Sequence, residues 1–308
     1  MASGRKISPA WFLFLFAPVI AEYVGGSSSI FNPIFIGINL LLYGCGVLII
    51  RELRAIWRKG WLSVFLMSIA YTIFEEGIML NTLFDPLQNT VGRFLGVNWI
   101  WAVGMLIIHS LVSVFLPIFF VETFYPEAAH ERWTTSMTLS LVSFLFLFDT
   151  FIMGTLIAPH NRPSGVYYVV EFLIIALCLV LARFITVPAR SDFKIHSPRW
   201  YYIATLSTFA LLIMAEFILP AASFPAPVII VVMLAAYFAF VRFLIAHGVF
   251  SESLSGQSRF AVAAGMITFW ILISFVKLLG GFFSPAIVAI FIVAFLFRMK
   301  HRIPVATA

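Results

Sequence analysis

Two adjacent glutamates and a histidine on the following apolar segment are the residues of this sequence best suited to chemistry. Glu75 and Glu76 lie near the end of one apolar segment, and His109 lies within the next. Two carboxyl groups this close titrate as a coupled pair, in which one keeps its proton longer than the other. The pair can then supply an acid and a base together, and the neutral imidazole of His109 can orient a water molecule between itself and Glu75. These residues could therefore activate water for hydrolysis.

The same three residues allow other chemistry, and the sequence leaves the choice open. Buried carboxyl groups can hold a cation or relay a proton as well as activate water. Two glutamates and a histidine could also bind zinc or iron, but none of the three stands in an H-x-x-x-H or E-x-x-H spacing. We therefore expect neither a metal nor another cofactor.

Further polar residues interrupt the apolar segments or lie at their ends. An ionisable group at bilayer depth costs roughly 2.5–3.5 kcal/mol, so each needs a partner, a cavity or a proton. We expect one group of these residues to line a polar cavity around the glutamate pair, and Glu171 to reach the membrane interface instead. The expected cavity-lining residues are Glu22, Thr72, Asn81, Asp149, His160 and Glu216.

The composition indicates where these residues must be placed. The chain has 308 residues, of which 62% are hydrophobic and 10% charged, and its mean hydropathy is +1.06. These values lie far from those of soluble domains and exclude a soluble enzyme, a disordered scaffold and a nucleic-acid binder. Apolar runs of about 20 residues can each cross a hydrocarbon core about 30 Å thick.

The apolar runs predict an all-α bundle of about ten membrane spans in a single domain, residues 1–308. The site-bearing core is expected at 61–121, and the last two spans could instead form one re-entrant pair around Gly280 and Gly281. The predicted spans are 10–24, 31–50, 61–80, 99–121, 134–158, 166–186, 200–219, 225–246, 259–280 and 281–298.

The distribution of Lys and Arg predicts the orientation of the bundle. With the N-terminus and C-terminus inside, all of the 19 Lys and Arg residues except Arg93, Arg162 and Lys277 fall on the cytoplasmic side. The intramembrane acids then lie in the outer half of the membrane. We expect a multi-pass plasma-membrane protein, with lipid and a membrane-embedded peptide or lipid-linked substrate as partners.

Two connecting regions carry further signals. In the connector 81–98, Asp85 and Gln88 form a capping box around Pro86, which predicts a short interfacial helix closed by Gly96. At the cytoplasmic side, we expect the charged residues from Arg51 to Lys59 to anchor the chain at lipid phosphates. The loop that starts at Glu122 is expected to be solvated.

The glutamate pair and the histidine resemble a family of membrane enzymes. The CPBP intramembrane glutamic proteases, which include the CAAX prenyl endopeptidases, have the motifs E-E-x-x-x-R, F-x-x-x-H and a third histidine with a small polar residue four positions later. Glu75, Glu76 and His109 match the first two motifs. The resemblance implies an all-helical enzyme in which glutamate and histidine activate water to cleave a peptide bond without a metal.

The sequence departs from this pattern at three places. Leu80 stands where the arginine is expected, and Met105 where the phenylalanine is expected. His160-x-x-x-Ser164 has the spacing of the third motif but falls in a predicted loop. The wider pattern, including Glu22 and the connector 81–98, also resembles an uncharacterised group of prokaryotic polytopic membrane proteins, which implies no function.

Three hypotheses therefore remain open. The first is an intramembrane hydrolase that acts on peptide or lipid-linked substrates entering laterally. The second is a proton- or cation-coupled secondary transporter that uses the acidic residues as ligands. The third is an accessory membrane subunit in which the polar residues only hold helices together.

Overall fold

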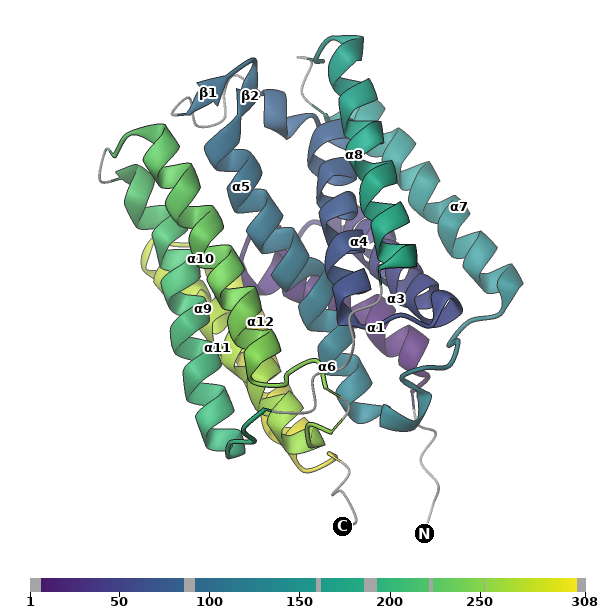
Figure 1. The fold of residues 1–308 in the computed structure, drawn as a ribbon, viewed down its shortest axis with the longest axis vertical. Helices are drawn as coiled ribbons and strands as arrows, with labels where there is room; N and C mark the ends of the chain where they lie inside the picture. The colour runs from purple at the N-terminus through teal and green to yellow at the C-terminus, as the bar shows by residue number, and fades with distance from the viewer. Residues whose placement is uncertain are drawn as a thin grey trace.

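The computed structural model describes residues 7–85, 92–158, 162–185, 193–221, 224–251 and 253–303, and at positions 157, 216, 217, 220 and 221 only the backbone. Helices dominate this part of the chain (Figure 1). The α-helices are α1 (Pro9–Pro18), α2 (Pro33–Asn39), α3 (Gly46–Trp57), α4 (Trp61–Ile73), α5 (Trp99–Ile108), α6 (Leu116–Phe124), α7 (Ser136–Ile152), α8 (Gly165–Phe184), α9 (Pro198–Ala221), α10 (Ala226–Ala246), α11 (Gly256–Leu279) and α12 (Phe283–Lys300).

Short segments of other helical geometry continue or join these helices. The 3-10 segments are η4 (Thr82–Phe84) and η6 (Pro126–Ala128). The π-helical segments are η1 (Val19–Val24), η2 (Leu40–Cys45), η3 (Phe74–Met79), η5 (His109–Phe115) and η7 (Met153–Ile157). A π-helical turn holds one more residue than an α-helical turn and often marks a functional site.

The helices confirm the predicted all-α membrane bundle. Each of the ten predicted spans coincides with a helix or with a run of α- and π-helix, and the ends agree to within a few residues except that the second helix continues to Trp57. In the described part of the chain, eight of these are long and apolar enough to cross a membrane, and Pro9–Val24 is a shorter apolar helix. Helices α11 and α12 both belong to the eight, which favours two full spans over one re-entrant pair around Gly280 and Gly281.

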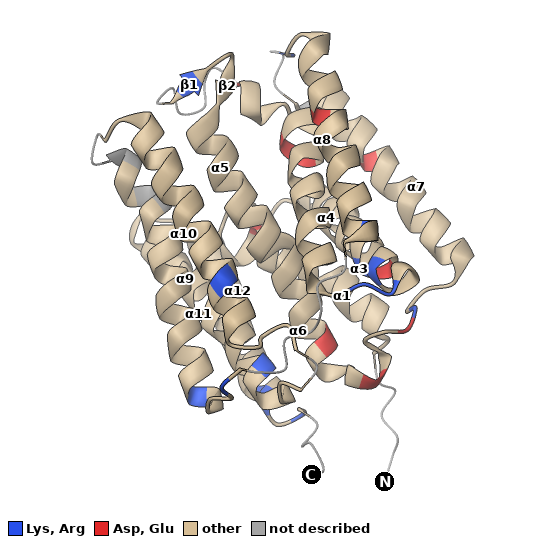
Figure 2. Cartoon of the chain, in the orientation of Figure 1, with Lys and Arg blue, Asp and Glu red and all other residues tan. Residues whose placement is uncertain are grey.

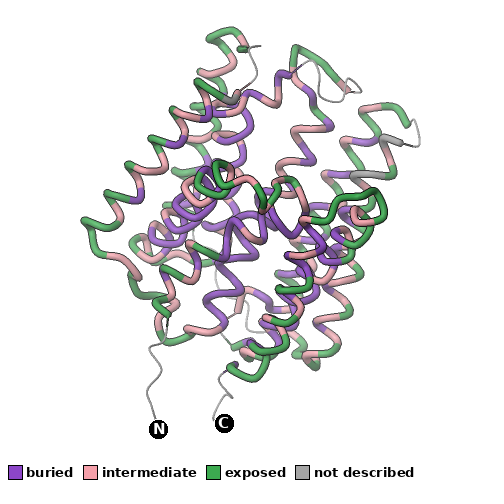
Figure 3. The backbone as a smooth tube through the Cα atoms, turned by 180° about the vertical axis from the view of Figure 1, so that it is seen from behind, coloured by how far each residue is buried: buried purple, intermediate pink, exposed green. Residues whose placement is uncertain are grey.

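The helix formed by α5, η5 and α6 runs through the middle of the bundle (Figure 1). Helices α9 to α12 lie on one side of it and α3, α4, α7 and α8 on the other, and the buried residues concentrate between these groups (Figure 3). Phe115, Phe119 and Phe120 are fully buried there. Trp61 meets Phe119 edge to face, and Phe65 stacks on Phe115.

The described part of the chain begins and ends at the same end of the bundle, as an even number of spans requires (Figure 1). A group of Lys and Arg residues surrounds this end (Figure 2). The hairpin of β1 (Arg93–Phe94) and β2 (Val97–Asn98) lies at the opposite end (Figure 1). This arrangement agrees with the charge pattern on which the predicted orientation rests.

The expected interfacial charge anchor is instead a buried ion-pair network. Arg51 and Glu52 are both 0% exposed, and Glu122 is 1% exposed. Arg51 Nη1 lies 2.9 Å from Glu52 Oε1, and Arg54 Nη1 lies 2.5 Å from Glu122 Oε2. The sequence expectation was wrong because Glu122 belongs to the central helix, where neighbouring helices exclude solvent and the guanidinium groups of α3 compensate its charge.

The predicted interfacial helix in the connector 81–98 is also wrong where the structure describes it. Residues 93–98 form a hairpin, with Arg93 paired to Asn98 and Phe94 to Val97. Leu95 and Gly96 both have positive φ, 51° and 73°, as the two central residues of a type I′ turn require. Pro86 and Gln88, on which the capping box depends, lie outside the described residues.

Candidate functional site

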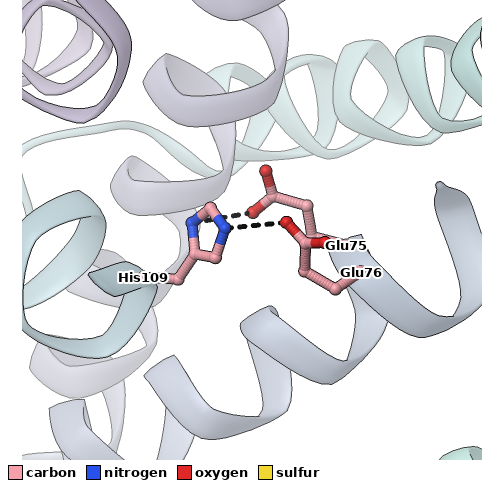
Figure 4. Close-up of side chains that lie close together, drawn as sticks. All are labelled: Glu75, Glu76 and His109. Atoms are coloured by element: carbon pink, nitrogen blue, oxygen red, sulfur yellow. Dashed lines mark hydrogen bonds and ion pairs between the residues drawn. The ribbon is translucent and has the colours of Figure 1, made fainter. Parts of the chain in front are cut away.

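Glu75, Glu76 and His109 lie together in the buried interior (Figure 4). His109 Nε2 lies 2.9 Å from Glu76 Oε1, and His109 Nδ1 lies 3.4 Å from Glu75 Oε2. The two carboxylates therefore flank opposite nitrogens of one imidazole ring. Ser113 Oγ lies 3.1 Å from Nδ1, so this nitrogen has a hydroxyl neighbour as well.

The local helix geometry explains how two adjacent glutamates can approach one ring. Both belong to the π-helical segment η3, and His109 is the first residue of the π-helical segment η5. The wider π-helical turn changes the direction in which successive side chains leave the helix. Glu75 and Glu76 therefore both reach His109, although adjacent residues of a regular α-helix diverge by about 100°.

A tyrosine from another span, Tyr43, extends this group of three residues. The Tyr43 hydroxyl lies 2.7 Å from Glu75 Oε1 and 2.8 Å from Glu22 Oε1. Ser28 donates to the other carboxylate oxygen of Glu22 at 2.7 Å. The Tyr43 ring also stacks on the His109 ring at a centroid distance of 6.2 Å. We call Glu22, Tyr43, Glu75, Glu76 and His109 the polar cluster.

Every member of the polar cluster lies in a π-helical segment. Glu22 is in η1, Tyr43 in η2, the two adjacent glutamates in η3 and His109 in η5. Four segments of this uncommon geometry, far apart in the chain, thus meet at one place. Since a π-helical turn gives up regular hydrogen bonding, their convergence indicates that side-chain placement in the cluster has a function.

The hydrogen bonds of Tyr43 imply a shared proton. A phenol has one hydrogen, which it can donate to one carboxylate at a time. Both contacts of the Tyr43 hydroxyl are full hydrogen bonds only when Glu22 or Glu75 is itself protonated and donates to the phenolic oxygen. One proton shared between the two carboxyl groups would satisfy both contacts.

The polar cluster continues toward the end of the bundle opposite the termini. Thr82 donates to Glu76 Oε2 and accepts from Trp101 Nε1 at 3.2 Å. Beside it, Asn81 has a left-handed backbone conformation with a φ of 56°, and its Oδ1 accepts from the Tyr168 hydroxyl at 2.7 Å. Asn81 thus lies beside Thr82 and directly precedes η4.

Other expected cavity residues do not join the polar cluster. Thr72 is buried, but its hydroxyl donates to the Ser68 carbonyl of its own helix. Asp149 is buried on α7, and its Oδ2 has no hydrogen-bond partner among the described residues. His160 and the side chain of Glu216 lie outside the described residues.

Glu171 does not reach the interface, contrary to expectation. It is 6% exposed, and neither carboxylate oxygen has a hydrogen-bond partner in the described part of the chain. Its carboxylate packs directly on Gly77, where a Cβ atom would collide with it. Gly77 directly follows Glu76 in η3, so this close contact packs α8 against the segment that carries the two glutamates.

The sequence analysis did not include Tyr43 or Ser28 among the site residues. A tyrosine inside an apolar run was a usable signal, because a buried phenol needs a hydrogen-bond partner. Its partners, however, come from two other spans, and no spacing in the sequence indicates them.

The polar cluster could also hold a metal ion. Ligand atoms of Glu75, Glu76 and His109 all lie within 4.8 Å of one another. In the observed conformation, however, the two carboxylates face different nitrogens of the ring rather than converging on one. Metal ligation by all three would require one side chain to change its conformation, whereas proton exchange with the ring would not.

The chain belongs to a family described as an uncharacterized membrane protein family, whose model matches residues 12–303. No curated protein matches the chain. No solved structure matches it either. The protein is therefore a multi-pass helical membrane protein of this family with a buried cluster of glutamates and one histidine.

Proposed function

We propose that the protein is an intramembrane hydrolase in which Glu75 acts as the general base. One observation carries this proposal: Glu75 Oε2 is buried, lies 3.4 Å from His109 Nδ1 and accepts no hydrogen bond from the described residues. A buried polar atom without a partner in a native structure calls for an explanation such as bound water or a catalytic role. Its lone pairs are available to a water molecule.

The remaining carboxylate oxygens of the pair are already engaged. Tyr43 contacts Glu75 Oε1, His109 contacts Glu76 Oε1, and Thr82 contacts Glu76 Oε2. Glu76 thereby fixes the orientation of the imidazole, as a carboxylate beside a catalytic histidine does. Glu75 keeps one oxygen for chemistry.

The proposed reaction follows from these roles. Glu75 Oε2 removes a proton from water while the oxygen of that water bonds to the carbonyl carbon of a peptide or lipid-linked substrate. The tetrahedral intermediate then breaks its bond to the leaving group, which receives a proton from the Glu75–His109 pair. Water has been added across the bond, and the carboxylate is restored.

The position of the polar residues favours a site that is open to one side of the membrane. Ser28 follows the first span and Thr82 the third, so both lie toward the end opposite the termini. Toward the other end, the same helices carry the buried aromatic side chains of Phe115, Phe119 and Trp61. A hydrolase needs access from one side or from lipid, whereas a transporter needs access from both.

A proton-coupled secondary transporter is the second candidate. The shared proton of Glu22, Tyr43 and Glu75 favours it, because coupling requires a carboxyl group that can load and release a proton. For either function we propose the plasma membrane as the location, with lipid and a membrane-embedded peptide or lipid-linked substrate as partners.

Incorporation of heavy oxygen tests the proposal without a known substrate. The purified protein is reconstituted with extracted membrane lipids and membrane peptides in water labelled with oxygen-18, and products are sought by mass spectrometry. We expect products that carry one labelled oxygen. The result would contradict hydrolysis and support transport if the lipids and peptides stay unlabelled over many hours while the same vesicles take up a solute in response to a pH gradient.

A further inference from the structure

A long groove separate from the polar cluster lies between α9, α11 and α12. Its volume is about 810 Å³, and it runs along α11 from Gln257 to Ile271. Fourteen residues of helix correspond to roughly 21 Å at a rise of 1.5 Å per residue. The groove thus extends from the end of the bundle that holds the termini to beyond the middle of the helix.

The interior of the groove is apolar. Ala261 and Ala264 line it along α11, and Val293 and Leu296 along α12. Tyr202 and Thr268 also line it, and they form a hydrogen bond with each other, in which the Tyr202 hydroxyl donates to Thr268 Oγ1 at 3.2 Å. Small side chains on α11 leave space beside the larger ones of α12, and this space suits a hydrocarbon chain.

The mouth of the groove is basic. Arg199, Lys300 and His301 line it at the helix ends, and all three are exposed. No acidic residue belongs to the groove lining that the structure describes. Among the described residues, these three side chains form neither a hydrogen bond nor an ion pair, so they are available to a ligand.

We propose that this groove binds an anionic phospholipid of the leaflet on the side of the termini. The phosphate lies between Arg199 and Lys300, and one acyl chain follows α11 over Ala261 and Ala264. Basic pockets between helices on the cytoplasmic side bind anionic headgroups by charge, and the apolar interior contributes through burial of the chain. A zwitterionic lipid or a free fatty chain would lack one of these two contributions.

Native mass spectrometry of the full chain with added lipid tests this proposal. We expect phosphatidylglycerol to bind at least tenfold more tightly than phosphatidylcholine with the same chains. Arg199→Gln/Lys300→Gln should remove this preference. Arg298→Gln is the matched control, because Arg298 lies on the same helix, is exposed and does not line the groove.

A second variant tests the acyl-chain part of the site. Ala264→Phe fills the interior of the groove, and we expect it to weaken binding of both lipids while the helical circular dichroism signal stays unchanged. Equal binding of the two lipids by the wild type would overturn the proposal. So would an unchanged preference in the double variant, or unchanged binding of phosphatidylglycerol by a folded Ala264→Phe protein.

Discussion

Glu75 Oε2 lies 3.4 Å from His109 Nδ1, and it is the one carboxylate oxygen of the glutamate pair that the described residues leave without a hydrogen bond. The side chain is 1% exposed, so bulk solvent does not compensate for the missing bond. A polar atom that is buried, unbonded and beside an imidazole suits the general-base role that we propose for Glu75.

The shared proton predicts a spectroscopic signature. In infrared spectra of the detergent-solubilised protein, we expect the carbonyl band of a protonated buried carboxyl group. Tyr43→Phe should shift this band to higher frequency, because the carboxyl group loses its hydrogen bond to the phenol. Asp149→Asn serves as the control, because it removes a different buried carboxyl group. A carbonyl band whose frequency is the same in Tyr43→Phe as in the wild type would contradict the shared proton.

The buried ion pairs at the termini side should matter for stability. Glu122→Gln removes the compensating charge of Arg51 and Arg54, and we expect a loss of about 3–5 kcal/mol in the free energy of unfolding. Arg132→Gln is the control, because this side chain is 39% exposed and lies 3.8 Å from Glu52. Its effect should stay within about 1 kcal/mol. Equal losses in the free energy of unfolding for Glu122→Gln and Arg132→Gln in denaturant titrations would contradict this prediction.

The contact between Gly77 and Glu171 predicts a steric effect. Gly77→Ala places a Cβ atom against the Glu171 carboxylate, and we expect a loss of about 1–3 kcal/mol from overpacking. Glu171→Ala should relieve most of this loss in the double variant. Gly37→Ala is the control, because a Cβ atom there meets nothing within 4 Å. Independent, additive effects of the two substitutions would argue against the contact.

A histidine outside the membrane spans predicts a pH dependence. Burial, and then the positive charge of the neighbouring His196, lower the pKa of His247 below its ordinary value. The two rings lie 5.3 Å apart. Protonation therefore favours the unfolded state, so stability should fall as the pH drops through about 6.5 toward the lowered pKa. His247→Gln should flatten this part of the melting-temperature profile between pH 8 and pH 5, and an unchanged slope would disprove the assignment.

Hydropathy and charge predicted the spans, because apolar runs and the placement of Lys and Arg are local properties of the sequence. The meeting of Glu75, Glu76 and His109 was also predictable, since adjacent spans of an up-and-down bundle bring such residues to similar depth. Tyr43 was not, because its contact with two glutamates depends on π-helical turns that carry no recognised sequence signature. The burial of Glu122 depends on which helix occupies the centre, which hydropathy does not reveal.

The most direct test of Glu75 as the base compares three reconstituted proteins in oxygen-18 water. We expect the wild type and Asp149→Asn to form labelled products at similar rates, because Asp149 is buried but lies outside the polar cluster. Glu75→Gln should lower the rate by a factor of about 100 or more while the protein keeps its fold. Labelled product formed by folded Glu75→Gln at the wild-type rate would contradict the account.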